Sequence, residues 1–162
     1  MPRLFSFHLE RDELNRRLGG GFPEGSMVMI EGENGSGKSA ICQRLTYGFL
    51  CNEISVTYIS TQLTTKGFIN QMYSLDYPIG TYLLNRNLLF IPVIPLVKEA
   101  KSRSDFIERL INAEELYKTN VIIIDTISEL IKYSANPEKS IELVSFFKKV
   151  TGMGKVIIYT VN

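Results

Sequence analysis

The chain alternates between short hydrophobic runs and longer segments in which apolar residues recur every three or four positions. Runs made mostly of β-branched, aliphatic and aromatic residues are typical of strands that are buried on both faces of a sheet. A further strand is predicted at Ser26–Glu31, because Pro23 and Gly25 turn the chain into it. The buried runs are Val56–Ser60, Leu88–Ile91, Val121–Ile124 and Val156–Tyr159.

Helical segments are predicted between these strands. One follows the first strand and continues to about Cys51. Another begins at Asn136 and Pro137, a favourable cap and first-turn pair, and ends near Val150. Shorter helices are predicted at Arg11–Leu18, Thr64–Leu75 and Thr81–Asn85.

The segment before Val121 has an amphipathic pattern that predicts one more helix, which Ser102 or Ser104 can cap. Its apolar face consists of Phe106, Leu110, Ala113 and Tyr117. Because strands alternate with helices, we expect an α/β fold with a mostly parallel central sheet and helices on both faces. No internal repeat or linker divides residues 1–162, which are expected to form one domain.

Composition narrows the range of partners. Hydrophobic residues make up 44% of the 162 residues, which is typical of a globular domain. Lys and Arg total 18 and Asp and Glu total 17, so no basic excess indicates a nucleic-acid partner. No run reaches the roughly 18 apolar residues of a membrane span, and the N-terminus has no apolar signal segment. We expect a cytoplasmic protein without direct membrane insertion.

The cysteines and the histidine of the chain add little to the candidate chemistry. Cys42 and Cys51 lie nine residues apart on a predicted helix, which separates them by about 13 Å. A disulfide needs Cα atoms within about 7 Å, so both are expected to be buried thiols in a reducing compartment. His8 is the single histidine, and a surface or packing role is expected for it.

The stretch Gly32–Ser39 completes a phosphate-binding loop of the form G-x-x-x-x-G-K-[ST]. Its glycines let backbone N–H groups turn toward phosphate oxygens, Lys38 supplies an ammonium for them, and the Ser39 hydroxyl is a hard oxygen ligand for Mg²⁺. The loop is expected to open a helix whose positive end faces the anion. The candidate ATP-binding residues are Gly32, Glu33, Asn34, Gly35, Ser36, Gly37, Lys38, Ser39 and Ala40.

A second, weaker pattern overlaps this loop. Gly35–Ala40 also fits G-x-G-x-x-[GA], the fingerprint of dinucleotide-binding proteins. That pattern leaves Lys38 and Ser39 unexplained, so a nucleoside triphosphate is the favoured ligand. No base-reading motif separates ATP from GTP.

Asp125 is the predicted second ligand for Mg²⁺, together with Ser39. It ends the buried run Val121–Ile124, and a metal-facing carboxylate is expected at the end of a strand near the phosphate loop. Burial of this carboxylate beside aliphatic residues would be costly without a cation or hydrogen bonds. An ordinary turn aspartate is the alternative interpretation.

A general base for hydrolysis is harder to find. Gln62, at the end of the second strand, can orient a water molecule but cannot take its proton. Glu33 and Glu129 are the nearest carboxylates in the sequence, and nothing in their spacing supports a catalytic role. Thr160 and Asn162, at the end of the last strand, are candidate sensors of the γ-phosphate.

The segment Leu18–Ser26, followed by a strand and the loop Gly32–Ser39, resembles the KaiC-like branch of the RecA ATPase family. More narrowly, the loop together with Thr57–Thr61, Thr64–Phe68 and Val121–Thr126 resembles the ATP-binding accessory proteins of the archaellum, the archaeal flagellum. The resemblance covers most of the chain. The stretch Thr64–Phe68 is its more discriminating part, because phosphate loops are widespread.

This resemblance implies a RecA-like P-loop core in which the last strand lies between the loop strand and the Asp125 strand. It implies that Lys38, Ser39 and Asp125 bind ATP and Mg²⁺. Family members form rings, here expected to be hexameric, that dock onto the motor ATPase beneath its membrane platform. The protein would then be a nucleotide-gated assembly module, peripheral at the inner face of the membrane.

Two departures from the family pattern qualify these expectations. Relatives carry a catalytic glutamate near the end of the second strand, where this chain has Thr61 and Gln62, so weak or absent ATP hydrolysis is expected. RecA cores also continue beyond the strand that ends near Asn162. We therefore expect a core truncated after its last central strand, with C-terminal family elements absent and one sheet edge exposed.

Other functions stay open at this point. One is a RecA-type ATPase that acts on DNA, and another is an autokinase of the kind found among KaiC relatives. A small-molecule kinase would need an arginine-rich lid, and Arg103 and Arg109 lie in a segment that packs without such a role.

Overall fold

Five parallel strands form the central sheet in the order β3-β7-β6-β4-β5. The computed structural model describes residues 3–93, 105–132 and 138–162. All five predicted strands are present, and their ends differ from the predicted ones by at most two residues. The strands are β3 (Met27–Glu31), β4 (Val56–Ser60), β5 (Leu88–Pro92), β6 (Val121–Asp125) and β7 (Val156–Val161).

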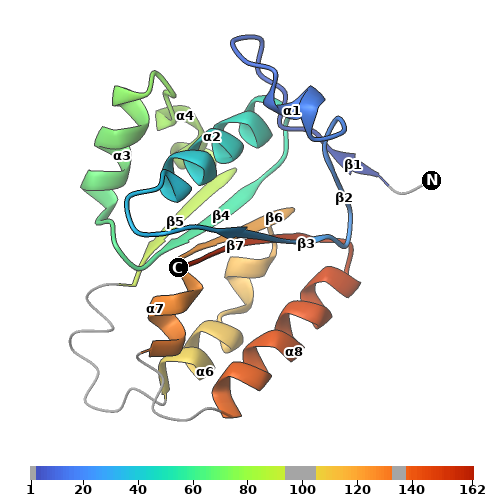
Figure 1. Ribbon diagram of the computed structural model, residues 1–162, viewed down its shortest axis with the longest axis vertical. Helices are drawn as coiled ribbons and strands as arrows, with labels where there is room; N and C mark the ends of the chain where they lie inside the picture. Colours follow the sequence, from blue (N-terminus) through green and yellow to red (C-terminus); the bar gives the residue numbers. More distant parts are fainter. Residues whose placement is uncertain (1–2, 94–104, 133–137) are drawn as a thin grey trace.

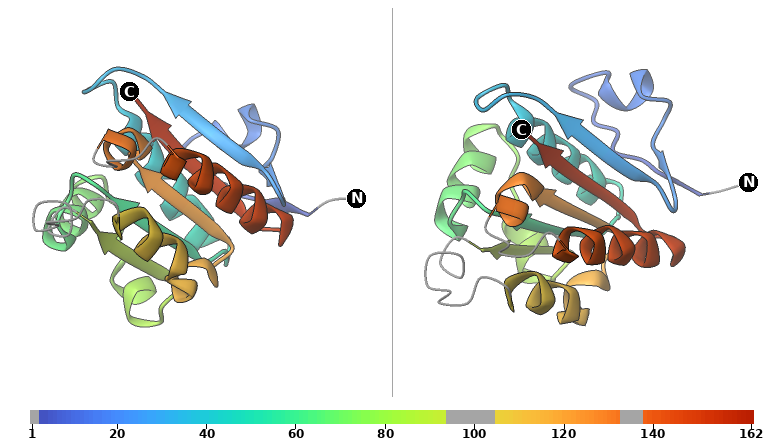
Figure 2. Two further views of the ribbon diagram at one scale, coloured as in Figure 1. Left: turned by 90° about the horizontal axis from the view of Figure 1, so that it is seen from below. Right: turned by 60° about the horizontal axis from the view of Figure 1, so that its bottom comes forward.

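Helices cover both faces of the sheet, as the alternating pattern predicts (Figures 1 and 2). One face is covered by α2 (Lys38–Cys51), α3 (Thr65–Ser74) and α4 (Gly80–Leu84). The other is covered by α6 (Asp105–Asn112), α7 (Ile127–Lys132) and α8 (Glu138–Gly152). β7 lies between β3 and β6, which confirms the strand order that the family resemblance implies. None of the helices in the described residues is long and apolar enough to cross a membrane.

Two hydrophobic cores lie on the two faces of the sheet. Side chains from β4 and β6 alternate between them, so every residue of these two strands is buried. Tyr58 and Ile123 pack into the core below α2, whereas Ile59 and Ile124 pack into the core below α8. This two-sided burial explains why β6 is a nearly continuous apolar run, whereas β4 also carries the buried polar residues Thr57 and Ser60.

The loop strand β3 lies at one edge of the sheet. Among the described strands it pairs with β7 alone, so its other edge has no strand beside it. Met27 and Met29 of β3 are exposed to solvent, and Met29 is 54% exposed.

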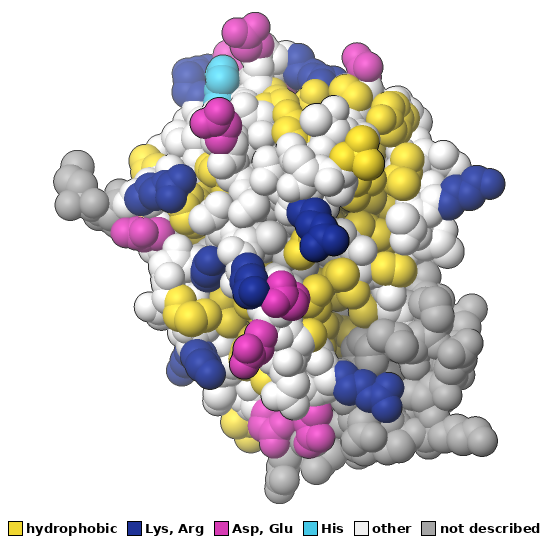
Figure 3. Space-filling model, turned by 180° about the vertical axis from the view of Figure 1, so that it is seen from behind, with side chains coloured by type: hydrophobic (Ala, Val, Ile, Leu, Met, Phe, Trp, Pro, Cys, Tyr) yellow, Lys and Arg dark blue, Asp and Glu magenta, His cyan; other side chains and the backbone are white. Residues whose placement is uncertain are grey.

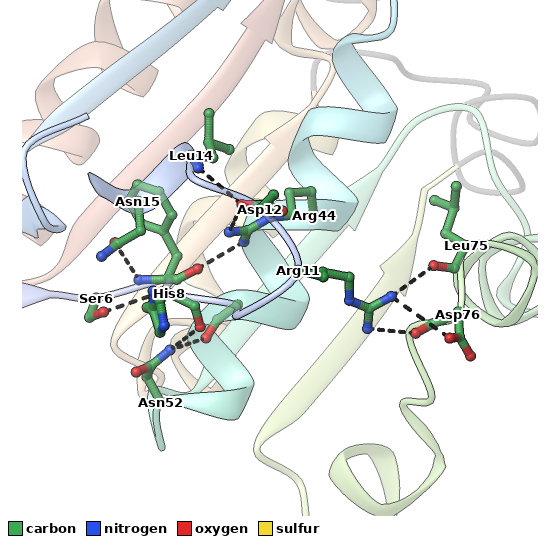
Figure 4. A network of polar contacts seen from close by, with 12 residues as sticks. Ser6, His8, Arg11, Asp12, Leu14, Asn15, Arg44, Asn52, Leu75 and Asp76 are labelled. Atoms are coloured by element: carbon green, nitrogen blue, oxygen red, sulfur yellow. Dashed lines mark hydrogen bonds and ion pairs between the residues drawn. The ribbon is translucent and has the colours of Figure 1, made fainter. Parts of the chain in front are cut away.

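The N-terminal strap, residues 3–18, packs along α2 and contacts Arg44 of that helix (Figure 4). Two short strands were not predicted from the sequence: β1 (Leu4–Phe5), in the strap, pairs antiparallel with β2 (Phe22–Pro23), which follows the strap. The helix predicted at Arg11–Leu18 is wrong in length, since α1 spans only Leu14–Arg17. Asp12 explains the difference, because its carboxylate accepts the Leu14 backbone N–H and binds Arg44 of α2 instead of entering the helix.

Other predictions need correction or lie outside the described residues. Cys42 is buried, but Cys51 is exposed at the end of α2, so the prediction of two buried thiols is wrong for Cys51. The amphipathic helix is interrupted at Ala113, and a 3₁₀ turn, η1, follows at Glu114–Tyr117. The sequence analysis missed α7. The predicted caps Ser102, Ser104, Asn136 and Pro137 lie outside the described residues.

Candidate nucleotide-binding site

The phosphate loop joins β3 to α2 and takes its shape from its glycines. Gly35 and Gly37 have φ angles of 80° and 97°, a left-handed conformation that side chains with a Cβ rarely adopt. A Cβ on Gly32 would lie 2.5 Å from the Ser36 hydroxyl oxygen, so a larger residue there would force the Ser36 side chain to move. The motif therefore holds glycine where the backbone geometry requires it.

Helix α2 begins directly at Lys38, with Gly37 at its N-cap position and no side-chain cap. Backbone N–H groups in the first turn of a helix have no partner within the helix, and the helix dipole adds positive charge there. A pocket of about 310 Å³ lies at this end of α2. It is lined by Asn34, Gly35, Gly37, Lys38, Ser39, Ala40, Gln62, Asp125, Thr126 and Asn162.

Lys38 is held over the loop by the loop itself. Its side chain is nearly buried, and its Nζ donates to the carbonyl oxygens of Gly32 at 2.5 Å and Glu33 at 2.9 Å. An ammonium has three N–H donors, so this arrangement leaves one to face an anionic ligand. The loop carbonyls thus hold the positive charge at the pocket.

Asp125 lies at the carboxyl end of β6 and is only 3% exposed. Its Oδ2 accepts hydrogen bonds from the Ser39 hydroxyl at 2.7 Å and from the Tyr58 hydroxyl at 2.9 Å. Its Oδ1 accepts one from the Thr160 hydroxyl at 2.9 Å. These three donors compensate the burial of the carboxylate, which would otherwise be costly.

The pairing of Ser39 with Asp125 fits the chemistry of a magnesium site. Both offer hard oxygen donors, and Mg²⁺ in nucleotide sites is commonly held by one or two protein oxygens together with phosphate oxygens and water. No group of three or more His, Cys, Asp or Glu side chains suited to a metal occurs in the described residues.

Two neutral side chains surround the buried carboxylate. Burial raises the pKa of the Cys42 thiol well above its usual value, and the negative charge of Asp125 raises it further. Burial likewise raises the pKa of Tyr58, with smaller contributions from Cys42 and Asp125. Tyr58 consequently stays protonated near neutral pH and donates its hydroxyl proton to Asp125.

The structure brings together most of the residues that the sequence proposes. Lys38, Ser39 and Asp125 meet at the pocket. Of the loop residues, Gly32, Glu33 and Ser36 shape the turn behind the pocket wall rather than lining the pocket itself. Gln62 and Asn162 line the pocket, which is consistent with their proposed roles but does not test them.

Thr160 is fully buried, does not line the pocket, and donates its hydroxyl to Asp125. Its role as a γ-phosphate sensor stays a prediction. Glu33 and Glu129, the other carboxylates considered, are also absent from the pocket wall. Among the described residues that line the pocket, Asp125 is the one carboxylate.

Two residues of the site are not evident from the sequence pattern. Tyr58 lies within a predicted strand, and Thr126 is the residue after Asp125. Thr126 lines the pocket and donates its hydroxyl to the Thr160 carbonyl. For Tyr58, the available signal is a polar tip inside an otherwise buried strand, because such a hydroxyl needs a partner.

Comparison with known proteins agrees with this geometry. A family model described as "ATPase: KaiC" matches residues 12–162. The "Archaeal flagellar ATP-binding protein FlaH" of Methanocaldococcus jannaschii is 50% identical over 154 residues, which are 95% of this chain and 66% of that protein. The protein of the same name from Methanococcus voltae is 47% identical over 95% of this chain and 67% of its own length.

A solved structure gives the same result in three dimensions. The crystal structure of the flagellar accessory protein FlaH from Methanocaldococcus jannaschii superimposes with a TM-score of 0.92 at 49% identity, covering 99% of this chain and 71% of that one. The chain thus spans about two thirds of the length of these relatives. On sequence and structure alike, the chain belongs to the FlaH family within the KaiC-type ATPases.

Proposed function

We propose that the protein is an ATP-binding component of the archaellum that binds Mg-ATP in the pocket at the N-terminus of α2. The observation that carries this proposal is the convergence of Lys38, Ser39 and Asp125 on one pocket beside the uncapped end of a helix. The names of the FlaH relatives, archaeal flagellar ATP-binding proteins, support both the ligand and the setting.

The residues have separate tasks in this proposal. The backbone N–H groups of the loop and Lys38 bind the phosphate oxygens. Ser39 and Asp125 hold Mg²⁺, which neutralises charge on the phosphates when it is bound. The small loop residues Gly35, Gly37 and Ala40 keep the pocket wall free of side chains that would block a phosphate.

Hydrolysis is proposed to be weak or absent. Attack on the γ-phosphate requires a group that positions or deprotonates a water molecule. Gln62 lines the pocket, but its amide cannot accept a proton as a carboxylate does. Asp125 is already engaged with three hydroxyl donors. The site is therefore suited to retain ATP rather than to turn it over rapidly.

ATP retention suits a switch, so we further propose a nucleotide-gated assembly role. In this role the protein forms a ring, expected to be a hexamer, and docks onto the archaellum motor ATPase and its platform and ring proteins at the inner face of the membrane. ATP would favour the docking-competent state, because a ligand stabilises whichever state binds it better. On the face that Figure 3 shows, the Lys and Arg side chains of the described residues are interspersed with Asp and Glu rather than gathered into the basic patch that is typical of nucleic-acid binding.

The fate of bound nucleotide tests the ligand and the lack of turnover. The wild-type protein is incubated with Mg-ATP for hours, free ligand is removed, and the released nucleotide is separated by chromatography. Intact ATP near one equivalent per chain is expected, and none with Lys38→Ala. Release of many equivalents of ADP per site would contradict slow hydrolysis, and retention of ATP by Lys38→Ala would contradict the assigned site.

A pull-down against the motor ATPase tests the switch. Binding is compared with Mg-ATP, without nucleotide, and with Lys38→Ala in the presence of Mg-ATP. We expect strong capture in the first case alone. Equal capture in all three would show that docking does not depend on this site, even if ATP binds there.

A further inference from the structure

Tyr58 presents a polar atom inside an apolar core. The residue is fully buried in β4, between β5 and β6, and its ring packs against Phe68 and Phe90 with centroid distances of 4.8 and 5.8 Å. A phenylalanine would fill this ring space equally well. The hydroxyl must be compensated, since burying it without a hydrogen bond is costly, and its partner is Asp125 Oδ2 at 2.9 Å.

The three donors to Asp125 come from different parts of the fold. Ser39 belongs to the phosphate loop and lines the pocket, so its hydroxyl is available to a ligand. Tyr58 and Thr160 come from β4 and β7, which lie on either side of β6, and neither side chain lines the pocket. The two strand residues contact both oxygens of the carboxylate, Tyr58 at Oδ2 and Thr160 at Oδ1.

We propose that Tyr58 is a positioning residue that, together with Thr160, fixes the orientation in which Asp125 presents its carboxylate to the metal of bound Mg-ATP. This inference rests on the proposed function. A carboxylate held at both oxygens by neighbouring strands cannot rotate freely about its χ2 bond. Outer hydrogen-bond partners of this kind orient a metal ligand without touching the metal.

Ser39 differs from the other two donors, because its hydroxyl lies at the pocket and has lone pairs to offer a cation. A serine oxygen that ligates a cation does so through its lone pairs, and the hydroxyl proton then needs to point away from the metal. Tyr58 and Thr160 have no such second task. They therefore remain as donors to Asp125 whether or not the site is loaded.

Tyr58→Phe tests the proposal, because it removes one oxygen and keeps the packed ring. Binding of a fluorescent ATP analogue is measured in EDTA and then as a function of added Mg²⁺. We expect nucleotide affinity in EDTA to stay within about twofold of wild type, and the apparent affinity for Mg²⁺ to fall about 10- to 100-fold, as is typical for loss of an outer partner of a metal ligand.

Tyr117→Phe is the matched control. Tyr117 is also a buried tyrosine, but it lies in the opposite core and donates to the Leu110 carbonyl. This variant should keep both affinities. Thr160→Val, which removes the donor to Oδ1, should weaken Mg²⁺ binding in the same direction, and it serves as the second variant should Tyr58→Phe fold poorly in a thermal unfolding scan.

The outcomes separate the two proposals. Wild-type Mg²⁺ dependence in Tyr58→Phe and Thr160→Val, with normal nucleotide binding, would overturn the positioning role and leave the proposed function intact. An equal loss of affinity with and without Mg²⁺ would also overturn it, since that pattern indicates a deformed pocket. Absence of nucleotide binding in the wild-type protein would overturn both.

Discussion

Single side chains give the pocket its charge before any ligand arrives. Lys38 is anchored to two carbonyl oxygens of its own loop, and Ser39 is anchored to Asp125. Lys38, Ser39 and Asp125 are the residues that would bind Mg-ATP, and these hydrogen bonds hold their side chains in place before the ligand binds. Such preorganisation reduces the ordering that a ligand must impose when it binds.

Gln62 is the residue at which activity should be most easily changed. Gln62→Glu places a carboxylate on the pocket wall at a position that the glutamine already occupies. General bases contribute about 10²- to 10⁴-fold to such reactions, so we expect at least a tenfold rise in ATP turnover. Phosphate release under single-turnover conditions measures the effect.

Asn70→Asp is the control for added charge, because Asn70 is exposed on α3 and does not line the pocket. It should leave turnover at the wild-type level. An unchanged rate in Gln62→Glu would indicate that the missing base is not what limits hydrolysis.

At the element scale, α2 links the site to the rest of the molecule. Its first turn carries Lys38 and Ser39, and its middle packs against the sheet. Its outer side is clamped by the N-terminal strap through Arg44, which donates to the Phe7 carbonyl and to both carboxylate oxygens of Asp12 (Figure 4). The strap thus holds α2 about one to two turns beyond the residues that line the pocket.

Gly48 allows the strap to approach α2 closely. A Cβ at this position would collide with the Phe7 carbonyl and with the Arg44 guanidinium. Gly48→Ala should therefore lower the free energy of unfolding by about 1–3 kcal/mol, although alanine is the better helix former by about 1 kcal/mol. Denaturant unfolding measures this change.

Gly152→Ala is the matched control, since a Cβ there meets no atom within 4 Å. It should leave stability unchanged or raise it slightly. If Gly48→Ala has the same free energy of unfolding as wild type, the strap can move away from α2 without a measurable loss of stability.

The contact between Asp12 and Arg44 should make stability depend on acid pH. The hydrogen bond from Arg44 holds the pKa of Asp12 below its usual value of 3.8. A depressed pKa adds stability that is fully present above the usual value and is lost as the pH falls through the lower folded value. Asp12→Asn should lower the free energy of unfolding by about 1–2 kcal/mol near pH 7. The expected loss is this small because the Asp12 side chain is partly exposed to solvent.

Urea unfolding of both proteins from pH 7 to pH 2.5 tests this expectation. The difference in the free energy of unfolding between wild type and Asp12→Asn should become smaller below about pH 4. Asp76→Asn is the control, because Asp76 is exposed and lies 4.0 Å from Arg11. A difference that is constant over the whole range would show that the charge of Asp12 is not responsible.

At the scale of the whole molecule, the site is formed where the carboxyl ends of several parallel strands meet. The loop follows β3, Asp125 ends β6, and Gln62 and Asn162 follow β4 and β7. Open parallel sheets place ligands at this edge. A ligand held between four strands should therefore stabilise the fold as a unit.

Mg-ATP should raise the midpoint of thermal unfolding. A ligand at a hundred times its Kd adds about 2.7 kcal/mol, which corresponds to about 5–10 °C for a domain of this size. Differential scanning fluorimetry measures the shift in the wild-type protein and in Lys38→Ala. We expect no shift in the variant, and an equal shift in both would place the nucleotide elsewhere.

How far the sequence predicts this protein depends on the range of the interactions involved. Val121–Ile124 was predictable because a strand buried on both faces is a nearly continuous apolar run, and Val56–Ser60 because it is rich in β-branched and aromatic residues. The phosphate loop was predictable because Gly35, Gly37 and Lys38 act through their own local backbone. The burial of Asp125 was predictable from the run that it ends.

Only the tertiary structure decided which side chains meet across the sheet. Tyr58 and Thr160 reach Asp125 because β4 and β7 lie on either side of β6 in a particular register, which no local pattern specifies. The exposure of Cys51 and the shortened helix after Asp12 likewise depend on what packs against α2. The sequence by itself determined the five central strands, the longer helices beside the sheet and the phosphate chemistry, since these arise from neighbouring residues. The folded structure alone determined the hydrogen bonds from the flanking strands to the buried carboxylate, since these join Asp125 to residues 67 and 35 positions away.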